Sequence, residues 1–599
     1  MPLGYLATSQ PDPHCAIQPA GPRGQRTEQR LAQQQALTRW SYRPKSQFAS
    51  LISPMQDNAP GKGRPFLPVP FEHPNQLLAQ GIDYKGRWHV PTSGKGSSDG
   101  PEAILSVRIY AECGPLGPKL RRGEPEVGRS PLIPPPLAPA PANRHIPPTT
   151  MNAHQFPESH VFYRKLRRQY PRIIRGQGCY LYDAEGRRYL DGCGGAYVSN
   201  VGHGVSEIAD ALACQAATLG YVSGTTFTHD AVEQFAAELA ELSPGDLDFV
   251  YPLASGSEAV EAGLKLARQY WVEGGRPSKH KVIAFTPSYH GNTLLALSAS
   301  SREPYRTVYR EWVAEIIRVP APYSYRCNCQ GTTPLCSTCN GDAVEAAIAR
   351  EGADSIAALI GEPVGGSSTG ASVPRAEYWQ RIRSLCDRYE ILLVADEVLT
   401  GAGRTGTWSA LEPYGIVPDL MIVGKGIAGG YVPLSAVIAS RRLAEVLARG
   451  SGVPLHAQTF SHHATLCAAG VATIRYLRRH RLIERCAAMG QELHRALERL
   501  RSLPSVGDVR GRGLLAGIEL VADRDTRRPF PAARRFAELV SAEALGQGLV
   551  VWPNSGHLED GTGDLVMLAP PFVIEPEQIS ELVTTLARAI ERVSDRVEP

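Results

Sequence analysis

The chain has 599 residues, of which 43% are hydrophobic and 20% are charged, as in globular proteins with more than one domain. A formal net charge of +4 gives no indication of a nucleic-acid or polyanionic partner. The sequence shows neither the apolar run of a secretory signal nor a stretch suited to span a bilayer. Twelve cysteines are too sparse for a disulfide framework. We therefore expect a cytoplasmic protein with no membrane partner.

Residues 1–150 differ in composition from the rest of the chain. Pro, Gly, Arg and Gln are frequent, hydrophobic periodicity is weak, and residues 131–148 are rich in proline. Such a segment buries too little apolar surface to offset its chain entropy, which predicts a disordered Pro/Arg-rich extension. The extension has either a targeting or binding role or results from a translation start assigned too far upstream. We favour the second explanation, with Met151 as the alternative start.

From Met151 onward, helical patterns alternate with short apolar runs, as in an α/β protein. Each expected strand is followed by Gly, Pro or acidic residues; the strands are Val282–Phe285, Ile356–Ile360, Ile391–Ala395 and Leu420–Val423. This repetition predicts a mostly parallel sheet covered by helices on both faces. Ligands of such sheets bind at the carboxyl ends of the strands.

Smaller elements are expected on both sides of this region. Strands Tyr180–Tyr182 and Arg188–Leu190 border a polar turn and form a hairpin. A helix over Leu482–Leu500, strands near Gly513–Leu520 and Val566–Leu568, and a closing helix from Pro576 form a smaller α+β domain. The expected division is an N-terminal segment of the small domain at 151–205, a large domain at 206–475 and a C-terminal small domain at 476–599.

Two reactive side chains follow strands of the expected sheet. Lys425 stands between two glycines directly after Leu420–Val423, and a buried lysine readily becomes a neutral, nucleophilic amine. Asp396 follows a buried strand, where a carboxylate needs a cationic partner. A protonated ring nitrogen is one such partner. A tightly packed structural lysine and a salt-bridged or helix-capping aspartate are the alternatives.

Further polar residues occur at corresponding positions. Gly256 and Ser257 begin a helical stretch whose free N–H groups can hold a phosphate, although Ser257 could also be a simple helix cap. Tyr289 and His290 follow another strand, where an aromatic ring could stack on a planar ligand or lie at the surface. The remaining candidates are Glu362, Val398 and Thr459.

Together, these motifs resemble the class III, or ω-amino-acid type, aminotransferases of fold type I. The order PSYHG, GEPV, DEVLTGAGRTG, GKGIAGGYVPL and TFSHH matches that family, and Lys425 follows Asp396 at the family's spacing. The resemblance covers about residues 155–590. It implies a large domain with a mostly parallel sheet and a smaller C-terminal α+β domain.

The resemblance also implies the cofactor, pyridoxal phosphate (PLP), and the role of each residue. Lys425 would form the Schiff base and carry the proton, and Asp396 would pair with the pyridine nitrogen. Tyr289 would stack on one face of the ring and Val398 would pack on the other, His290 would be a further cofactor-binding residue, and Glu362 would lie beside the ring hydroxyl and the substrate. Family members form homodimers, or dimers of dimers, with shared active sites. The phosphate would thus contact Gly256, Ser257 and Thr459, the last from the other subunit.

The sequence departs from the family pattern at two places that bear on the site. Ala464 stands where the family commonly has a proline, and Met567 stands where ornithine-type members place a substrate-binding arginine. The methionine favours an amine or ω-amino acid as donor and a 2-oxo acid such as pyruvate as acceptor. Tyr197 and Trp552, together with the weaker candidate Tyr221, are expected to contact the substrate.

Other reactions are compatible with the same motifs. A PLP-dependent decarboxylase, racemase or aminomutase would keep all of them, and a non-catalytic PLP-binding protein would keep the fold. An aminotransferase working by a ping-pong mechanism is the interpretation that the resemblance favours.

A cysteine cluster lies outside these motifs. Cys327, Cys329, Cys336 and Cys339 form a C-x-C-x6-C-x2-C array. Four thiolates can bind one zinc ion, which would be structural. A loop of free thiols, or one oxidised pair, is the alternative, and we assign no metal from the sequence alone.

Overall fold

The computed structural model describes residues 159–597 except 330, 331 and 333. The extension expected at residues 1–150, including its possible misassigned start, lies outside these residues. Among the described residues, no helix has the length and apolar character needed to cross a membrane.

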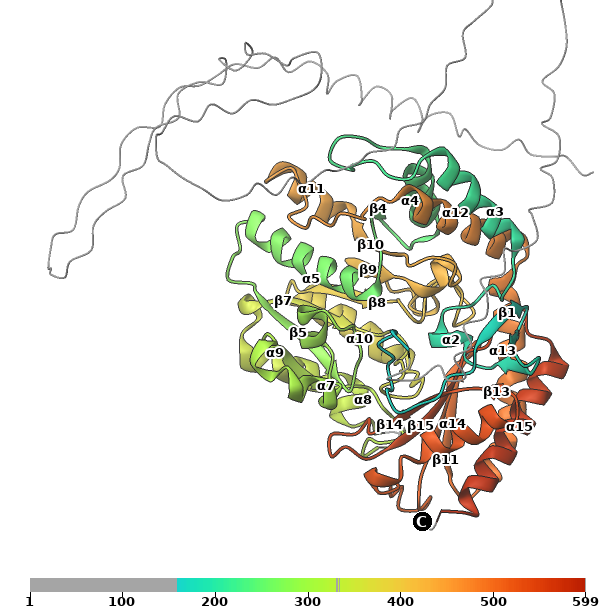
Figure 1. Cartoon of the computed structure of the whole chain (residues 1–599). Coiled ribbons are helices and arrows are strands. Elements are labelled where there is room, and N and C mark those ends of the chain that lie inside the picture. The colour runs from blue at the N-terminus through green and yellow to red at the C-terminus, as the bar shows by residue number, and fades with distance from the viewer. Residues whose placement is uncertain (1–158, 330–331, 333, 598–599) are drawn as a thin grey trace, which may run out of the picture. The chain divides into compact units, whose positions relative to one another are not determined.

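A seven-stranded sheet forms the centre of the larger part of the fold (Figure 1). Its strands, in spatial order, are β4 (Leu247–Leu253), β10 (Ser435–Ser440), β9 (Leu420–Val423), β8 (Leu392–Asp396), β7 (Ile356–Gly361), β5 (Lys281–Thr286) and β6 (Ile317–Pro320). Only β10 is antiparallel to its neighbours, so the other six strands of this sheet run in one direction. The prediction of a mostly parallel sheet is confirmed.

Alternating side chains of the strands explain why helices cover both faces. On β5, Val282 and Ala284 pack into the cluster that contains the apolar side of α5 (Gly256–Glu273). Ile283 and Phe285 pack on the opposite face. That face is covered by α9 (Asp342–Glu351), α10 (Ala376–Arg388), α4 (Asp230–Leu242) and α12 (Ala464–Arg479). A strand apolar on both faces is expected in such a buried sheet.

Six further helices precede the C-terminal part. They are α2 (Gly194–Tyr197), α3 (Ser206–Thr218), α6 (Leu294–Ala299), α7 (Glu303–Val308), α8 (Ser337–Asn340) and α11 (Arg441–Arg449). Single 3₁₀ turns are η1 (Arg310–Trp312), η2 (Ala353–Ser355), η3 (Glu412–Tyr414), η4 (Lys425–Ala428) and η6 (Ala532–Arg534).

The C-terminal part contains an antiparallel sheet in the order β11 (Val506–Arg512), β12 (Leu515–Leu520), β15 (Asp564–Leu568) and β14 (Trp552–Ser555). The expected helix from Leu482 is α13 (Leu482–Leu497), which continues as the 3₁₀ segment η5 (Glu498–Ser502). The other helices are α14 (Phe536–Gly546) and the closing helix α15 (Pro576–Ser594). The start of α15 at Pro576 agrees with the prediction.

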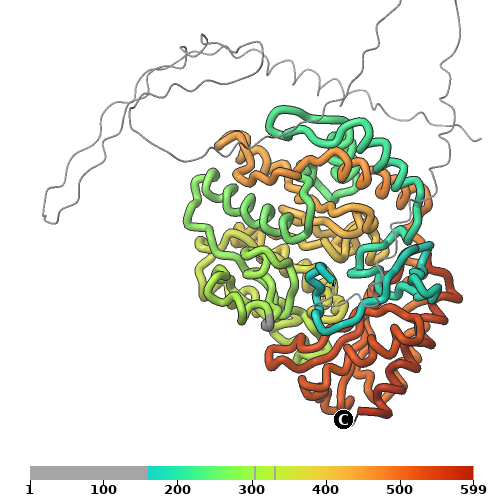
Figure 2. The backbone as a smooth tube through the Cα atoms, in the orientation of Figure 1, coloured from blue at the N-terminus to red at the C-terminus, as the bar shows by residue number. Residues whose placement is uncertain are grey.

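The first described strands join the C-terminal part. β1 (Ile173–Gln177), β2 (Tyr180–Asp183) and β3 (Arg188–Asp191) form a small antiparallel unit that includes the predicted hairpin. β3 then pairs in parallel with β13 (Leu549–Val550). In Figure 2, the cyan N-terminal tube accordingly lies beside the orange and red C-terminal tube.

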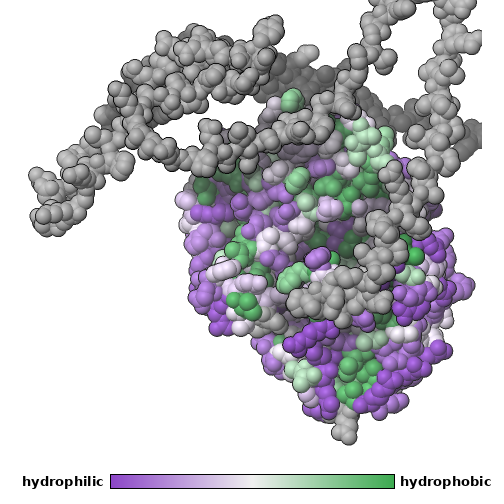
Figure 3. All heavy atoms as spheres, in the orientation of Figure 1, coloured by the Kyte–Doolittle hydropathy of each residue, from purple (hydrophilic) through white to green (hydrophobic). Residues whose placement is uncertain are grey.

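The outer rim of the face in Figure 3 is mainly hydrophilic, as expected for a solvated surface.

Candidate active site

Five parallel strands bring the predicted residues to one edge of the large sheet. β4, β5, β7, β8 and β9 end there, and the segments that follow carry Gly256 and Ser257, Tyr289 and His290, Glu362, Asp396, and Lys425. Because the strands are parallel, their carboxyl ends meet at this edge. Residues far apart in sequence thus gather around one place in the fold.

Lys425 begins η4 in a constrained backbone conformation. Its φ of 45° is left-handed, which is uncommon for a residue with a side chain and marks positions held by their surroundings. On its C-terminal side, Asn200 Nδ2 donates to the Gly426 carbonyl over 3.0 Å. Burial lowers the pKa of Lys425, and the nearby carboxylates of Asp396 and Glu362 oppose that shift. The amine therefore loses its proton more easily than an ordinary lysine.

Asp396 and His290 form a buried pair. His290 Nδ1 lies 2.6 Å from Asp396 Oδ2, and the Val398 amide donates to Oδ1 over 3.1 Å. Both side chains are buried, and His290 Nε2 has no hydrogen-bond partner among the described residues. The sequence prediction placed His290 beside a planar ligand but did not identify Asp396 as its partner. The pair fixes the orientation of the carboxylate.

The start of α5 corrects one alternative for Ser257. The N-cap of the helix is Ser255, which forms a capping box with Glu258. The sequence pattern S-x-x-E is typical of such a box and could have predicted it. Ser257 Oγ instead accepts a hydrogen bond from the Asn292 amide over 3.1 Å. Gly256 and Ser257 are the first two helical residues, whose N–H groups have no acceptor within the helix. These groups can hold an anion.

Val398 connects the helix start with the lysine turn. A Cβ on Gly256 would lie 2.8 Å from Val398 Cγ1, and one on Gly424 would lie 3.3 Å from the same atom. The first distance is shorter than any ordinary contact, so Gly256 must be a glycine for the backbone to approach Val398. Two segments of the site are thus packed against one side chain.

Glu362 and Tyr289 contact each other from the loops that follow the neighbouring strands β7 and β5. Glu362 accepts hydrogen bonds from the backbone amides of Tyr289, over 3.2 Å, and Gly366, over 3.1 Å. Burial raises the pKa of Glu362, and His290 opposes that shift. The guanidinium of Arg302 lies 4.9 Å from the centre of the Tyr289 ring, a cation–π distance.

The two main substrate candidates lie together near the lysine. The Tyr197 ring centre is 5.9 Å from Lys425 Nζ and 5.5 Å from the centre of the Trp552 ring. Tyr197 is buried, and its hydroxyl has no hydrogen-bond partner among the described residues. Buried Met567 pairs with Trp552 across β14 and β15. The environment at position 567 is therefore apolar.

Thr459 and Tyr221 lie in an exposed aromatic region and not among the residues above. Thr459 is exposed, and its neighbour Gln458 donates to Glu258 Oε1 over 3.2 Å, which joins this segment to the start of α5. The Tyr221 ring lies 6.2 Å from that of Phe460.

Ala464, which stands where the family commonly has a proline, is the first residue of α12. The N–H group at this position has no acceptor within the helix, so a proline would also fit there. Either residue type is compatible with that position.

A cavity of about 1570 Å³ adjoins these residues. Trp552 and Arg302 are among its lining residues, whereas Lys425 and Asp396 are not, so the cavity lies beside the centre of the site. Its lining includes two acidic residues, Glu538 and Glu559, against eight basic ones: Arg164, Lys165, Arg168, Arg302, Arg306, Arg318, Arg326 and Arg535. Lys165 and Arg535 pair with Glu538, and Arg326 pairs with Glu519 outside the lining; the positive charge that is left attracts anions.

The residues present fit a phosphorylated, planar, carbonyl-bearing cofactor. A primary amine of lowered pKa, a buried oriented carboxylate and an anion-binding helix start lie at the same sheet edge. The close contact between Gly256 and Val398 packs the helix start against the segment that carries the carboxylate. This combination corresponds to the requirements of PLP.

Comparisons with known proteins agree with the interpretation of these residues as a PLP site. Residues 164–590 match the family described as Aminotransferase class-III. The uncharacterized aminotransferase YodT of Bacillus subtilis is 35% identical, over 74% of this chain and 99% of that protein. The putrescine–pyruvate aminotransferase of Pseudomonas aeruginosa is 31% identical, over 76% of this chain and 96% of that protein.

Solved structures give the same result. An (S)-enantioselective omega-transaminase from Thermomicrobium roseum superposes with a TM-score of 0.68 at 35% identity, over 73% of this chain and 97% of that one. An amine transaminase from an uncultivated Pseudomonas species, solved in its PLP-bound form, has a TM-score of 0.67 at 33% identity, over 73% and 97%.

These matches confirm the predicted fold type I architecture, the enzyme class and the cofactor. They span nearly the whole described region, and the residues at the sheet edge suit the cofactor's chemistry. The chain therefore belongs to the class III aminotransferases, a family of PLP-dependent enzymes.

Proposed function

We propose that this enzyme moves an amino group from an amine or ω-amino acid to a 2-oxo acid such as pyruvate, by a ping-pong mechanism. The observation that carries the proposal is the position of Lys425, whose lowered pKa makes it an available base, at the sheet edge that also holds Asp396. The putrescine–pyruvate relative and the omega-transaminase structures support this choice of donor and acceptor.

Each site residue has a proposed task. When bound, PLP supplies an aldehyde that reacts with primary amines and a ring that withdraws electrons while its nitrogen is protonated. Lys425 holds the aldehyde at rest and, once released, removes and returns the substrate proton at its Nζ. Asp396, oriented by His290, keeps the ring nitrogen protonated. Tyr289 and Val398 hold the ring from its faces, and Glu362 orients the ring hydroxyl.

The phosphate is proposed to bind the N–H groups of Gly256 and Ser257 and the Ser257 hydroxyl. Thr459 of the partner subunit supplies a further hydroxyl in a homodimer with shared sites. Exposure of Thr459 next to Phe460, 53% exposed, and Leu455, 63% exposed, supports a subunit interface there. A dimer of dimers and a cytoplasmic location stay predictions.

Substrate selection is proposed to use two kinds of surface. Tyr197, Trp552 and the buried Met567 offer an apolar wall for the carbon chain of the amine. The basic lining of the adjoining cavity attracts the carboxylate of the acceptor, and Arg302 is the cation placed against Tyr289.

A panel of amino donors with pyruvate and 2-oxoglutarate as acceptors tests the proposal. We expect transfer to pyruvate from at least one primary amine, and parallel lines in double-reciprocal plots. The donor alone should convert one equivalent of the cofactor to its amine form without further turnover. Release of carbon dioxide, or racemisation without transfer, would instead identify a decarboxylase or racemase on this scaffold. Bound PLP that no donor converts would identify a non-catalytic binding protein.

A further inference from the structure

Four cysteines on the segment between β6 and α9 lie in one cluster. The Sγ atoms of Cys327, Cys329, Cys336 and Cys339 are all within 4.8 Å of one another. Three of the separations are 3.2 Å between Cys327 and Cys339, 3.4 Å between Cys327 and Cys329, and 3.5 Å between Cys329 and Cys336. The catalytic proposal above uses none of these thiols.

The spacing of the sulfur atoms suits a tetrahedral ion better than covalent bonds. A Zn²⁺ ion with Zn–S bonds of about 2.3 Å places its four sulfurs about 3.8 Å apart. A disulfide requires about 2.05 Å, and each of these three separations is more than an ångström longer. The sulfurs thus lie at the corners of a site of the correct size for zinc.

The backbone presents the thiols from two turns. Cys336 caps the single-turn helix α8, and the Cys339 amide donates back to the Cys336 carbonyl over 3.0 Å, so these two thiols come from one turn. Cys327 and Cys329 approach from the preceding turn, which begins at Tyr323. Cys339 is buried and the other three are partly buried, which leaves a route for an ion to enter.

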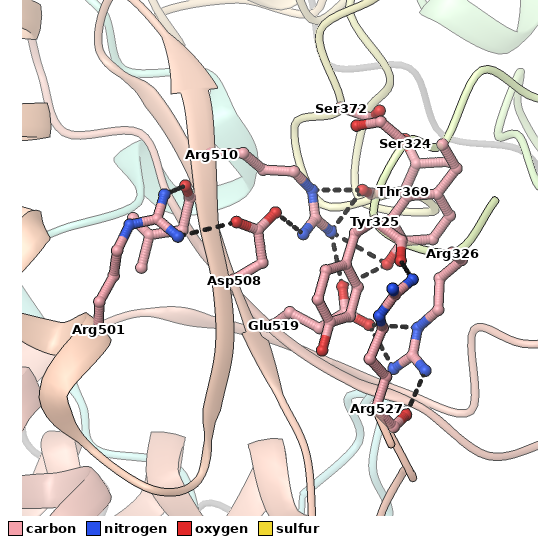
Figure 4. A network of polar contacts seen from close by, with 12 residues as sticks. Ser324, Tyr325, Arg326, Thr369, Ser372, Arg501, Asp508, Arg510, Glu519 and Arg527 are labelled. Carbon is pink, nitrogen blue, oxygen red and sulfur yellow. Dashed lines mark hydrogen bonds and ion pairs between the residues drawn. The ribbon is translucent and has the colours of Figure 1, made fainter. Parts of the chain in front are cut away.

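The same segment anchors a buried polar network (Figure 4). Arg326, which directly precedes Cys327, donates to Glu519 Oε1 on β12 from Nε, over 3.0 Å, and from Nη2, over 2.7 Å. The Tyr323 hydroxyl and Arg510 Nη2 bind the other oxygen of Glu519. Cys327 and Arg326 also line the basic cavity. An ion that fixes Cys327 would therefore also fix one wall of this cavity.

We propose that Cys327, Cys329, Cys336 and Cys339 bind one Zn²⁺ as four thiolates, and that this ion holds Tyr323 and Arg326 on Glu519. With four protein ligands, the ion has no open position for a substrate, so its role is structural. Loss of the metal loosens the cavity wall and raises the KM of the acceptor more than it lowers kcat. The metal site itself does not depend on the proposed choice of substrates.

Metal analysis of the full-length enzyme tests the site directly. Protein produced with zinc in the medium should carry about one zinc per chain, and the double variant Cys336→Ser/Cys339→Ser should carry none. Cys214→Ser, an exposed cysteine outside the cluster, is the matched control and should retain zinc. Zinc-free wild type, zinc retained by the double variant, or an equivalent of iron in place of zinc would each overturn the assignment.

A second measurement uses the wild-type protein alone, in case the double variant fails to fold. Protein produced with cobalt should show the intense thiolate-to-metal bands and the visible bands of tetrahedral Co²⁺ with sulfur ligands. Thiol counting in denaturant with a chelator should find all four cysteines of the cluster reduced. Octahedral cobalt spectra, or thiols missing in pairs because of disulfides, would refute a four-thiolate site.

Discussion

His290 Nδ1 and Asp396 Oδ2 lie 2.6 Å apart in a buried pair at the carboxyl end of β8. Asp396 is the residue proposed to hold the cofactor's ring nitrogen, and His290 is the side chain that fixes its second oxygen. Hydrogen bonds to charged groups contribute about 1.5–3 kcal/mol.

We therefore expect His290→Ala to weaken PLP binding by roughly 10- to 150-fold, the equivalent of that free energy. His290→Asn retains a donor near the position of Nδ1 and should recover part of the affinity. Equilibrium dialysis of PLP with each variant measures the effect. Equal affinities of wild type and His290→Ala would show that the pair does not support cofactor binding.

Lys425→Ala should abolish turnover, because the loss of a positioned base alone costs about 10²–10⁴-fold in rate. Borohydride treatment of the loaded wild type, followed by peptide mass spectrometry, should locate the cofactor on residue 425. Lys279, a buried lysine at the opposite edge of the sheet, donates to three backbone carbonyls and should remain unmodified. Labelling at any other lysine would contradict the assignment.

Mixed dimers test whether Thr459 acts across subunits. Thr459→Ala alone should bind PLP weakly, and Lys425→Ala alone should be inactive. In a mixed dimer with shared sites, one site carries both changes and the other is entirely wild type. We expect co-expressed, differently tagged subunits to recover close to half the wild-type activity at low PLP concentration. Activity no higher than that of the Thr459→Ala homodimer would show that Thr459 serves its own subunit.

His557 should make stability depend on pH between about 4 and 6.5. Burial lowers the pKa of His557 to about 4, so the folded protein keeps it neutral while the unfolded chain takes up a proton below pH 6.5. Its contribution to stability is therefore present at neutral pH and is lost as the pH falls through this window, by roughly 3 kcal/mol.

His557→Gln removes this titration, and its Tm should fall less between pH 7 and pH 4.5 than that of the wild type. His280→Gln, at an exposed histidine, is the control and should follow the wild type. Parallel Tm profiles for the wild type and His557→Gln would contradict the prediction.

The central strands could be predicted from sequence because they are apolar on both faces and end at Gly, Pro or acidic residues. The predicted run Ile356–Ile360 differs by one residue from β7. β4, β6 and β10 were not predicted. Asp248 interrupts β4 and Arg318 interrupts β6, whereas the apolar run of β10 is only four residues long between Ser435 and Ser440. Periodicity alone does not distinguish such strands from loops.

At the site, residue types and spacing predicted which side chains share the sheet edge, but not their pairing. His290 and Asp396 are adjacent because β5 and β8 lie on either side of β7, an arrangement that the sequence does not contain. The roles of the site residues and the domain boundaries stay predictions. Thr459 illustrates why its role stays a prediction: a single chain does not contain the contact with the partner subunit's phosphate site that Thr459 is expected to make.

The pairing of β3 with β13 has a consequence for the order in which the protein is made. During synthesis, β1–β3 leave the ribosome early, whereas β13 follows only after the whole large sheet has been translated. Until then, β3 presents an unpaired edge, a template for pairing with the wrong strand or another nascent chain. The β3 edge should thus become protected only late in co-translational folding, although β3 is made before the whole large sheet.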